Sequence, residues 1–297
     1  VNMVPFYIYY SMFGFQRIGD LAWAAGDQQA RGFLIGGTSG RTTLAGEGLQ
    51  HQDGHGLLFA QFIPNCVSYD PTFAYELAVI VQDGLRRMVQ EQEHVFYYIT
   101  TLNENYHHPA MPEGSREGIL KGMYLFKQGE GDGHRVQLLG CGAILNEVIA
   151  AADLLRDDWQ VGADIWSLPG INPLARDGQD AMRWNLLHPD QPPRVPYVTA
   201  CLEGHPGPVV AATDYMRMYA EQLRPFIHRH YLVLGTDGFG RSDTRAKLRR
   251  HFEVDRHYVA VAALNLLAEE GTLPVAKVQE AIKKYGIAAD KPNPVTV

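Results

Sequence analysis

The chain has 297 residues, of which 46% are hydrophobic and 20% charged, and its net charge is −7. This length exceeds the usual size of one hydrophobic core, so two domains are expected, and the composition excludes a disordered protein. Basic residues gather only in the short run 247–251, which argues against a nucleic-acid-binding surface. No apolar run reaches the roughly 20 residues that span a bilayer, and the first residues lack a signal-peptide pattern. We therefore expect neither a nucleic-acid partner nor a membrane.

The cysteines carry information about the compartment. Cys66, Cys141 and Cys201 are widely separated and odd in number, which supports neither a disulfide framework nor a zinc site. A reducing cytoplasm fits this usage. The sequence opens on Val1 and enters strand-like sequence at once, so we expect a fragment of a longer protein.

The first third alternates strand-like and helical stretches. Strands are expected at 6–10 and 94–100, and an irregular connection at 103–114 with a domain boundary near Pro112. A helix is expected over 70–88, with Asp70 as the N-cap and Pro71 at the first helical position. Its buried face should consist of Phe73, Leu77, Ile80, Val81 and Met88.

The remainder restarts the alternation. Strands are expected at 135–142 and 161–168, strand-and-turn units at 207–213 and 231–243, and a helix at 143–158. Further helices should begin near Asp255 and Thr272, the second ending at Gly286. Such alternation predicts an α/β fold with a mainly parallel sheet covered by helices.

The stretch GEGLQHQDGHG, residues 46–56, is crowded with chemical groups. His51 and His55 have the i, i+4 spacing of two metal ligands on a helix. Four glycines disfavour a helix there by about 1 kcal/mol each, which favours a loop. A loop that gathers Glu47, His51 and Asp53 is either a functional site or a hydrogen-bonded turn, and composition leaves both open.

Three other stretches are ambiguous. GGTSGRTT, residues 36–43, could bind an anion through backbone N–H groups, but it lacks the P-loop lysine pattern. The turn at 234–243 is rich in glycine and charge, and structural use is its favoured interpretation. Tyr10 and Phe13, in residues 8–15, would by themselves be read as core aromatics.

Four long runs, 5–55, 97–114, 174–189 and 234–255, carry a family resemblance. With them the chain resembles the C-terminal third of the homodimeric E1 component of pyruvate dehydrogenase, a thiamine-diphosphate family of the transketolase superfamily. The resemblance implies the latter part of a transketolase-like pyrimidine-binding domain at 1–112. A transketolase C-terminal-like α/β domain with a mostly parallel sheet would follow at 113–297.

The resemblance also implies roles for individual residues. Tyr10 and Phe13 would lie against the aminopyrimidine of thiamine diphosphate, where flat apolar rings exclude water. His51 would hydrogen-bond the oxyanion that develops on the 2-oxo acid, and Glu47 would orient it. Asp53 and His55 would support the loop. No metal ligand is expected in this chain, because the diphosphate and its Mg²⁺ would be held by an N-terminal region outside it.

The implied activity is the decarboxylation of pyruvate and the reductive acetylation of the lipoyl domain of dihydrolipoyl acetyltransferase. The complete enzyme would be a cytoplasmic homodimer, and the isolated chain would be inactive. Two alternatives stay open: a non-catalytic dimerisation or docking module, and a related enzyme that acts on another 2-oxo acid. A sugar-phosphate substrate is disfavoured because no dense basic motif is present.

Overall fold

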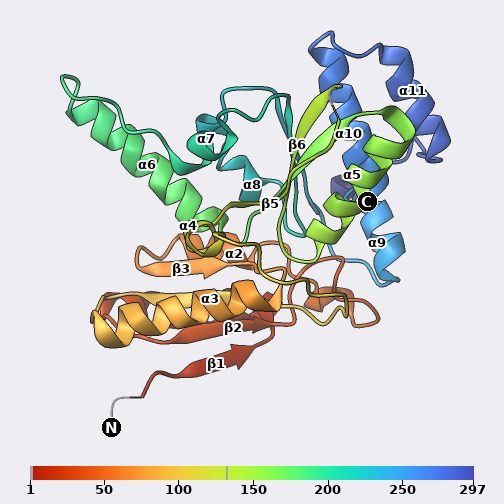
Figure 1. The fold of residues 1–297 in the computed structure, drawn as a ribbon. Coiled ribbons are helices and arrows are strands. Elements are labelled where there is room, and N and C mark those ends of the chain that lie inside the picture. The colour runs from red at the N-terminus through yellow and green to blue at the C-terminus, as the bar shows by residue number, and fades with distance from the viewer. Residues whose placement is uncertain (1–2, 132) are drawn as a thin grey trace.

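The computed structural model describes residues 3–131 and 133–297 and contains two sheets flanked by helices (Figure 1). The first sheet is fully parallel, in the order β1-β2-β4-β3. Its strands are β1 (Phe6–Tyr9), β2 (Phe33–Gly37), β3 (Cys66–Tyr69) and β4 (Phe96–Thr101). Its helices are α1 (Gly14–Asp27), α2 (Gly56–Gln61) and α3 (Ala74–Leu85), with a π-helical turn at Arg86–Gln90. We refer to residues 3–101 as the first unit.

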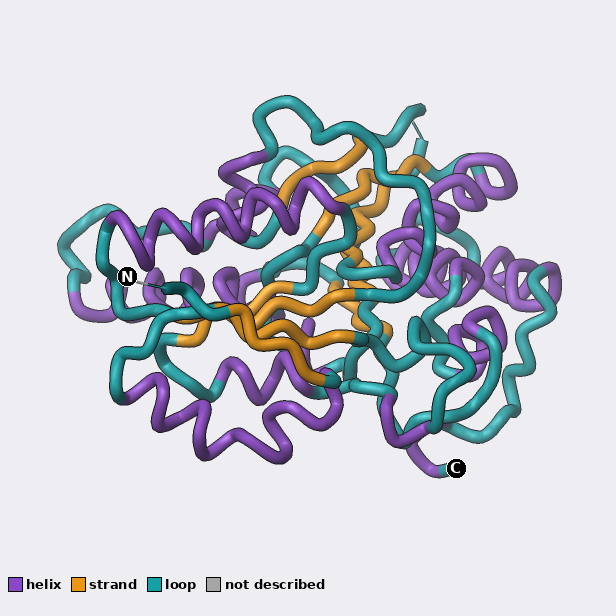
Figure 2. Tube along the Cα trace, turned by 90° about the horizontal axis from the view of Figure 1, so that it is seen from below, coloured by secondary structure: helices purple, strands orange, loops and turns teal. Residues whose placement is uncertain are grey.

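The second sheet has the order β5-β7-β6-β8-β9, and only β5 runs antiparallel to its neighbour. Its strands are β5 (Tyr124–Lys127), β6 (Arg135–Gly140), β7 (Gly162–Ser167), β8 (Val209–Ala212) and β9 (Tyr231–Leu234). The accompanying helices are α5 (Ile144–Trp159), α6 (Ile171–Leu187), α7 (Tyr197–Leu202), α8 (Met218–Glu221), α9 (Arg245–His251), α10 (Arg256–Glu269) and α11 (Val275–Lys284). Helix α4 (Arg116–Lys121) lies in the connection between the sheets and packs against α3. We refer to residues 124–131 and 133–297 as the second unit. Figure 2 shows helices on both sides of the strands, so the α/β prediction is confirmed.

Most predicted elements are present. The strands expected near 6, 94, 135, 161, 207 and 231 correspond to β1, β4, β6, β7, β8 and β9. The Asp255 carboxylate caps α10 by accepting from the backbone N–H groups of His257 and Tyr258 at 2.9 and 3.0 Å. The sequence reasoning did not identify strands β2, β3 and β5 or helices α1, α2, α4, α6, α7, α8 and α9.

Two predicted helix starts are wrong. Helix α3 begins at Ala74, and the Glu76 carboxylate, rather than Asp70, accepts from the N–H groups of Thr72 and Phe73 at 2.6 and 3.0 Å. Asp70 is instead buried between the two units, where it accepts from Thr100 Oγ1 at 2.5 Å.

The second wrong start lies at the other end of the chain. Helix α11 begins at Val275 rather than near Thr272. The Thr272 hydroxyl donates to the Leu267 carbonyl at 2.9 Å and so closes the preceding helix, α10. The predicted stop is close to correct, because α11 ends at Lys284 and Gly286 has φ +58°.

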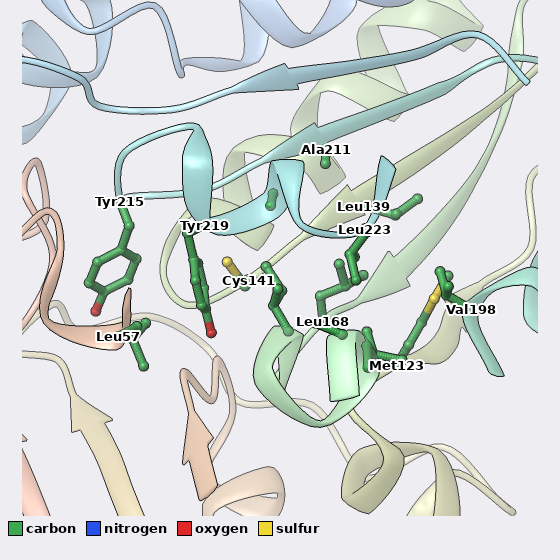
Figure 3. Packing of buried hydrophobic residues seen from close by; sticks show 14 of the residues in the cluster. Leu57, Met123, Leu139, Cys141, Leu168, Val198, Ala211, Tyr215, Tyr219 and Leu223 are labelled. Atoms are coloured by element: carbon green, nitrogen blue, oxygen red, sulfur yellow. The ribbon is translucent and has the colours of Figure 1, made fainter. Parts of the chain in front are cut away.

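One hydrophobic cluster crosses the junction between the units. Leu57 of α2 packs in the same cluster as Cys141, Tyr215 and Tyr219 of the second unit, and Figure 3 shows both tyrosine rings directed toward the Leu57 side. A second cluster fills the space between the second sheet and helices α5 and α10. The first unit is thus packed against the second through shared apolar side chains.

The described residues bear on two expectations, one about membrane-spanning helices and one about the cysteines. Among residues 3–131 and 133–297, no helix combines the length and the hydropathy needed to cross a bilayer. Cys66 and Cys141 are buried and Cys201 is half-buried, and all three thiols are free. Burial raises the pKa of the Cys66 thiol to about 12, which keeps it protonated and unreactive.

Candidate functional site

The candidate site lies where the segments that follow β1 and β2 meet. Tyr10 directly follows β1 and leads into a 3₁₀ turn at Ser11–Phe13, and the loop after β2 carries another 3₁₀ turn at Leu49–His51. The His51 ring centroid lies 5.2 Å from that of Tyr10 and 5.0 Å from that of Phe13. Because parallel strands bind ligands outside their carboxyl ends, this is the expected edge for a site.

The imidazole of His51 is available for a ligand. Within the described residues, neither ring nitrogen of His51 makes a hydrogen bond, and its Nδ1 is buried. The hydrogen bond of one ring nitrogen normally fixes the tautomer of the other, so Nε2 can serve here as donor or acceptor. Tyr10 is 51% exposed, and its ring offers a flat apolar surface beside the imidazole. The Arg17 guanidinium covers Phe13 at 4.3 Å.

Glu47 stands apart from this group. It is half-buried on the same loop as His51, and within the described chain its carboxylate makes no hydrogen bond or ion pair. Its backbone carbonyl accepts from Ser242 Oγ at 3.4 Å. The structure therefore brings together three of the four predicted site residues, and the orienting role of Glu47 stays a prediction.

A buried carboxylate ties the two site segments together. Asp53 is 0% exposed, and its Oδ1 accepts from the N–H groups of His55 and Gly56 at 2.9 and 2.8 Å, which places its charge at the start of α2. Its Oδ2 accepts from Ser11 Oγ, which also lies 2.7 Å from the Tyr98 hydroxyl. This chain of contacts connects strand β4, the turn 10–13 (the aromatic turn) and the loop 38–55 (the histidine loop).

His51 and His55 do not form the helical i, i+4 pair that a metal site at this spacing requires. His51 ends one 3₁₀ turn and His55 precedes α2, so the two side chains do not share a helix face. The His55 ring contacts Gln16 and packs 5.4 Å from Phe59, and burial lowers its pKa. In the part of the chain that the structure describes, no three His, Cys, Asp or Glu side chains form a metal-binding group.

The glycine-rich stretch 36–43 binds a carboxylate of the protein itself, that of Asp214. The backbone N–H groups of Thr42 and Thr43 donate to the Asp214 carboxylate at 2.8 and 3.0 Å, and both hydroxyls donate to it at 2.6 Å. Asp214 follows β8 in the second unit and is buried. Because these donors are used internally, the phosphate-binding interpretation is wrong.

The turn at 234–243 makes hydrogen bonds within the second unit and to the histidine loop. Asp237 accepts from the backbone N–H and Nε of Arg217 at 3.1 and 2.9 Å, and Thr236 Oγ1 donates to the Asp214 carbonyl at 2.8 Å. At its far end, the Arg241 N–H donates to Gln52 Oε1 at 2.7 Å. Sequence reasoning missed Ser11, Gln52 and Asp214 as supports of the site, because their partners lie far away in the chain.

Comparisons with known proteins agree on a family. Residues 1–109 match the pyruvate dehydrogenase E1 component middle domain, and residues 122–255 match the transketolase-like C-terminal domain. The chain is 62% identical to pyruvate dehydrogenase E1 components from Cupriavidus necator, Pseudomonas aeruginosa and Escherichia coli. These alignments cover 100%, 99% and 98% of the chain and 33% of each relative. The chain thus spans about a third of the length of these curated relatives.

Solved structures support the same fold. Transketolase from Leishmania mexicana superposes with a TM-score of 0.65 at 19% identity, over 92% of this chain and 36% of that protein. Transketolase from Campylobacter jejuni superposes with a TM-score of 0.63 at 17% identity, over 89% of this chain and 36% of that one. The fold is transketolase-like, and the chain belongs to the pyruvate dehydrogenase E1 component family, of which it is a C-terminal portion.

Proposed function

We propose that this chain forms part of a pyruvate dehydrogenase E1 component. The complete enzyme would decarboxylate pyruvate and transfer the remaining two carbons, oxidised to an acetyl group, to the lipoyl group of a dihydrolipoyl acetyltransferase, whose disulfide is reduced in the transfer. The observation that carries the proposal is the convergence of Tyr10, Phe13 and His51 at the carboxyl edge of a parallel sheet. It occurs in a chain that is 62% identical to E1 components along its whole length.

The site residues fit the pyrimidine end of thiamine diphosphate. Tyr10 and Phe13 would hold the aminopyrimidine against their rings, and His51 offers ring nitrogens without partners in the described residues. Bound thiamine diphosphate supplies the electron sink for decarboxylation. We assign the diphosphate and Mg²⁺ to polypeptide outside this chain.

The protein's own contribution is position and proton placement. We assign Nε2 of His51 to a hydrogen bond with the carbonyl oxygen of the 2-oxo acid, where negative charge develops. The rings of Tyr10 and Phe13 lie next to each other and against the imidazole, and bound cofactor would complete an environment of low polarity that strengthens this interaction. Glu47 is proposed to orient His51 when the substrate is bound.

The organisation of the complete protein is also part of the proposal. We place a partial pyrimidine-binding domain at 1–112 and a transketolase C-terminal-like domain at 113–297. The family matches, which end at 109 and resume at 122, support this boundary. The complete enzyme is proposed to be a homodimer in the cytoplasm, where free thiols such as those of Cys66, Cys141 and Cys201 persist.

The decisive test is His51→Ala in the complete enzyme. We expect pyruvate turnover to fall about 10²-fold or more, the range of lost acid–base assistance. His94→Ala, at an exposed histidine outside the site, is the matched control and should retain full activity. Unchanged turnover in His51→Ala would reject the assigned role.

Tyr10→Ala tests the cofactor contact separately. Loss of the ring should weaken thiamine diphosphate affinity roughly tenfold, measured by calorimetric titration of the complete enzyme. Tyr7→Ala removes another exposed tyrosine, three residues earlier on β1, and should leave the affinity unchanged. Equal affinities in the two variants would remove Tyr10 from the site.

A further inference from the structure

The loop that carries His51 is hydrogen-bonded to the second unit. Gln52, the residue after His51, is 1% exposed, and both ends of its carboxamide are used. Its Nε2 donates to the Leu44 carbonyl at 2.9 Å, within the same loop, and its Oε1 accepts from the Arg241 N–H at 2.7 Å. One side chain therefore joins two positions of the histidine loop, Leu44 and Gln52, to the second unit.

Further contacts surround this carboxamide. Arg41 Nη1 donates to the Gly238 carbonyl, and Ser242 Oγ donates to the Glu47 carbonyl at 3.4 Å. Gly240 packs so closely on the loop that an added Cβ would collide with the Leu49 carbonyl oxygen and lie 2.8 Å from Gln52 Oε1. The turn 238–242 thus touches the loop at several successive positions.

The turn is itself held firmly. The Thr236 N–H donates to the Tyr215 carbonyl at 2.8 Å, and the Asp237 carboxylate accepts twice from Arg217. By contrast, the His51 side chain makes no hydrogen bond within the described residues and is placed by its backbone and by ring contacts alone. The position of the imidazole therefore depends on what fixes the loop backbone.

We infer that Gln52 and the turn 238–242 form an interdomain clamp that positions His51 against Tyr10 and Phe13. Gln52 is a positioning residue, since it acts through the backbone of its neighbour. The catalytic role of the clamp rests on the proposed function, but its effect on the position of the His51 ring can be measured without cofactor or substrate. Misplacement of a reacting group by about 1 Å can cost about 10²-fold in rate, so such a clamp has catalytic value.

The first test uses nuclear magnetic resonance on the 297-residue chain with ¹³C-labelled histidine. The His51 Cε1–H signal, identified by its loss in His51→Asn, senses the ring currents of Tyr10 and Phe13. Gln52→Ala, which removes both bonds, and Gly240→Ala, which pushes on the loop from the other side, should each shift this signal. Gly19→Ala is the matched control, because an added Cβ there meets no atom within 4 Å.

A second measurement needs no substitution. The Arg241 amide should exchange with solvent about 100-fold more slowly than the amide of Phe239, a residue that is 80% exposed and whose N–H has no hydrogen-bond acceptor in the described residues. A His51 signal that stays in place in whichever of Gln52→Ala and Gly240→Ala folds overturns the clamp. Rapid exchange at Arg241 overturns it independently of both variants.

In the complete enzyme, Gln52→Ala should lower kcat about tenfold or more and change thiamine diphosphate affinity by less than about twofold, because the aromatic surface is intact. The two proposals fail differently. If His51→Ala is fully active while Gln52→Ala shifts the His51 signal, the catalytic role falls and the clamp stands. If His51→Ala is inactive and the signal does not move, the clamp falls alone.

Discussion

Both units contain buried central strands, and they differ most at the edges of their sheets, where β1 is more exposed than β5 or β9. In the second unit, β7 and β8 are buried along their whole length and β6 along all but its first residue. In the first unit, β1 lies at the sheet edge, and Phe6, Tyr7 and Ile8 are 50%, 56% and 68% exposed. Buried parallel strands form a core, whereas an edge strand presents unpaired backbone groups and side chains.

This difference teaches how core and site are divided. The second unit supplies most of the packed interior, and the first carries Tyr10, Phe13 and His51 on the segments after β1 and β2. Yet the histidine loop is connected to the second unit through Gln52 and through Asp214. The site residues therefore all lie in the first unit, but side chains and backbone of both units hold them in place.

Asp70, at the junction, gives the largest expected effect. Burial raises the pKa of its carboxyl from 3.8 to about 7, opposed by the hydrogen bond from Thr100. The unfolded chain loses this proton from about pH 4 upward while the folded chain keeps it to about pH 7. This group therefore lowers the free energy of unfolding by about 4 kcal/mol between those values.

Asp70→Asn should remove that loss, so the variant should gain stability over the parent chain as the pH rises from 4 to 8. Urea unfolding across this range measures it. Asp190→Asn, at an exposed carboxylate, should follow the parent profile. If the free energies of unfolding of Asp70→Asn and the parent changed with pH in the same way, the junction around Asp70 would be hydrated, unlike the core of the second unit.

Leu138→Ala sharpens the contrast from the core side. Leu138 is fully buried at the centre of β6, so the variant should lose about 3 kcal/mol in the free energy of unfolding. The His51 resonance should not move, because no site contact changes. Leu186→Ala, at a residue that is 78% exposed, should stay within about 0.5 kcal/mol of the parent. If the His51 resonance shifts in Leu138→Ala, the geometry of the site depends on the packing of the second unit's core.

Ser11→Ala should have the smallest effect on stability and a clear effect on the site. Removing a hydroxyl that serves a buried carboxylate should cost about 2 kcal/mol and loosen the aromatic turn from Asp53, so the His51 resonance should shift. Ser115→Ala is the control, since its hydroxyl donates to the Pro112 carbonyl at 2.7 Å outside the site. The same His51 signal in both serine variants would exclude Ser11 as a support.

The sequence could predict much of the second unit. Helix α5 and strands β6 and β7 follow from apolar runs and spacing, and the N-cap Asp255 is a local signal. Helix α6 and strand β2 went unrecognised, although α6 lies in one of the runs that carried the family resemblance. The helix start was predicted wrongly at Asp70 because the local sequence fits an N-cap, whereas the fold buries this residue between the two units.

By itself, the sequence determined the α/β class, the family and the candidates Tyr10, Phe13, Glu47 and His51, since periodicity and long runs of identity are written along the chain. Only the tertiary structure decided that Asp214 fills the 36–43 loop, that Asp53 joins the aromatic turn to the histidine loop, and that Gln52 reaches Arg241. Buried polar groups must find partners wherever the fold places them, and partners 42 to 189 residues apart leave no local pattern.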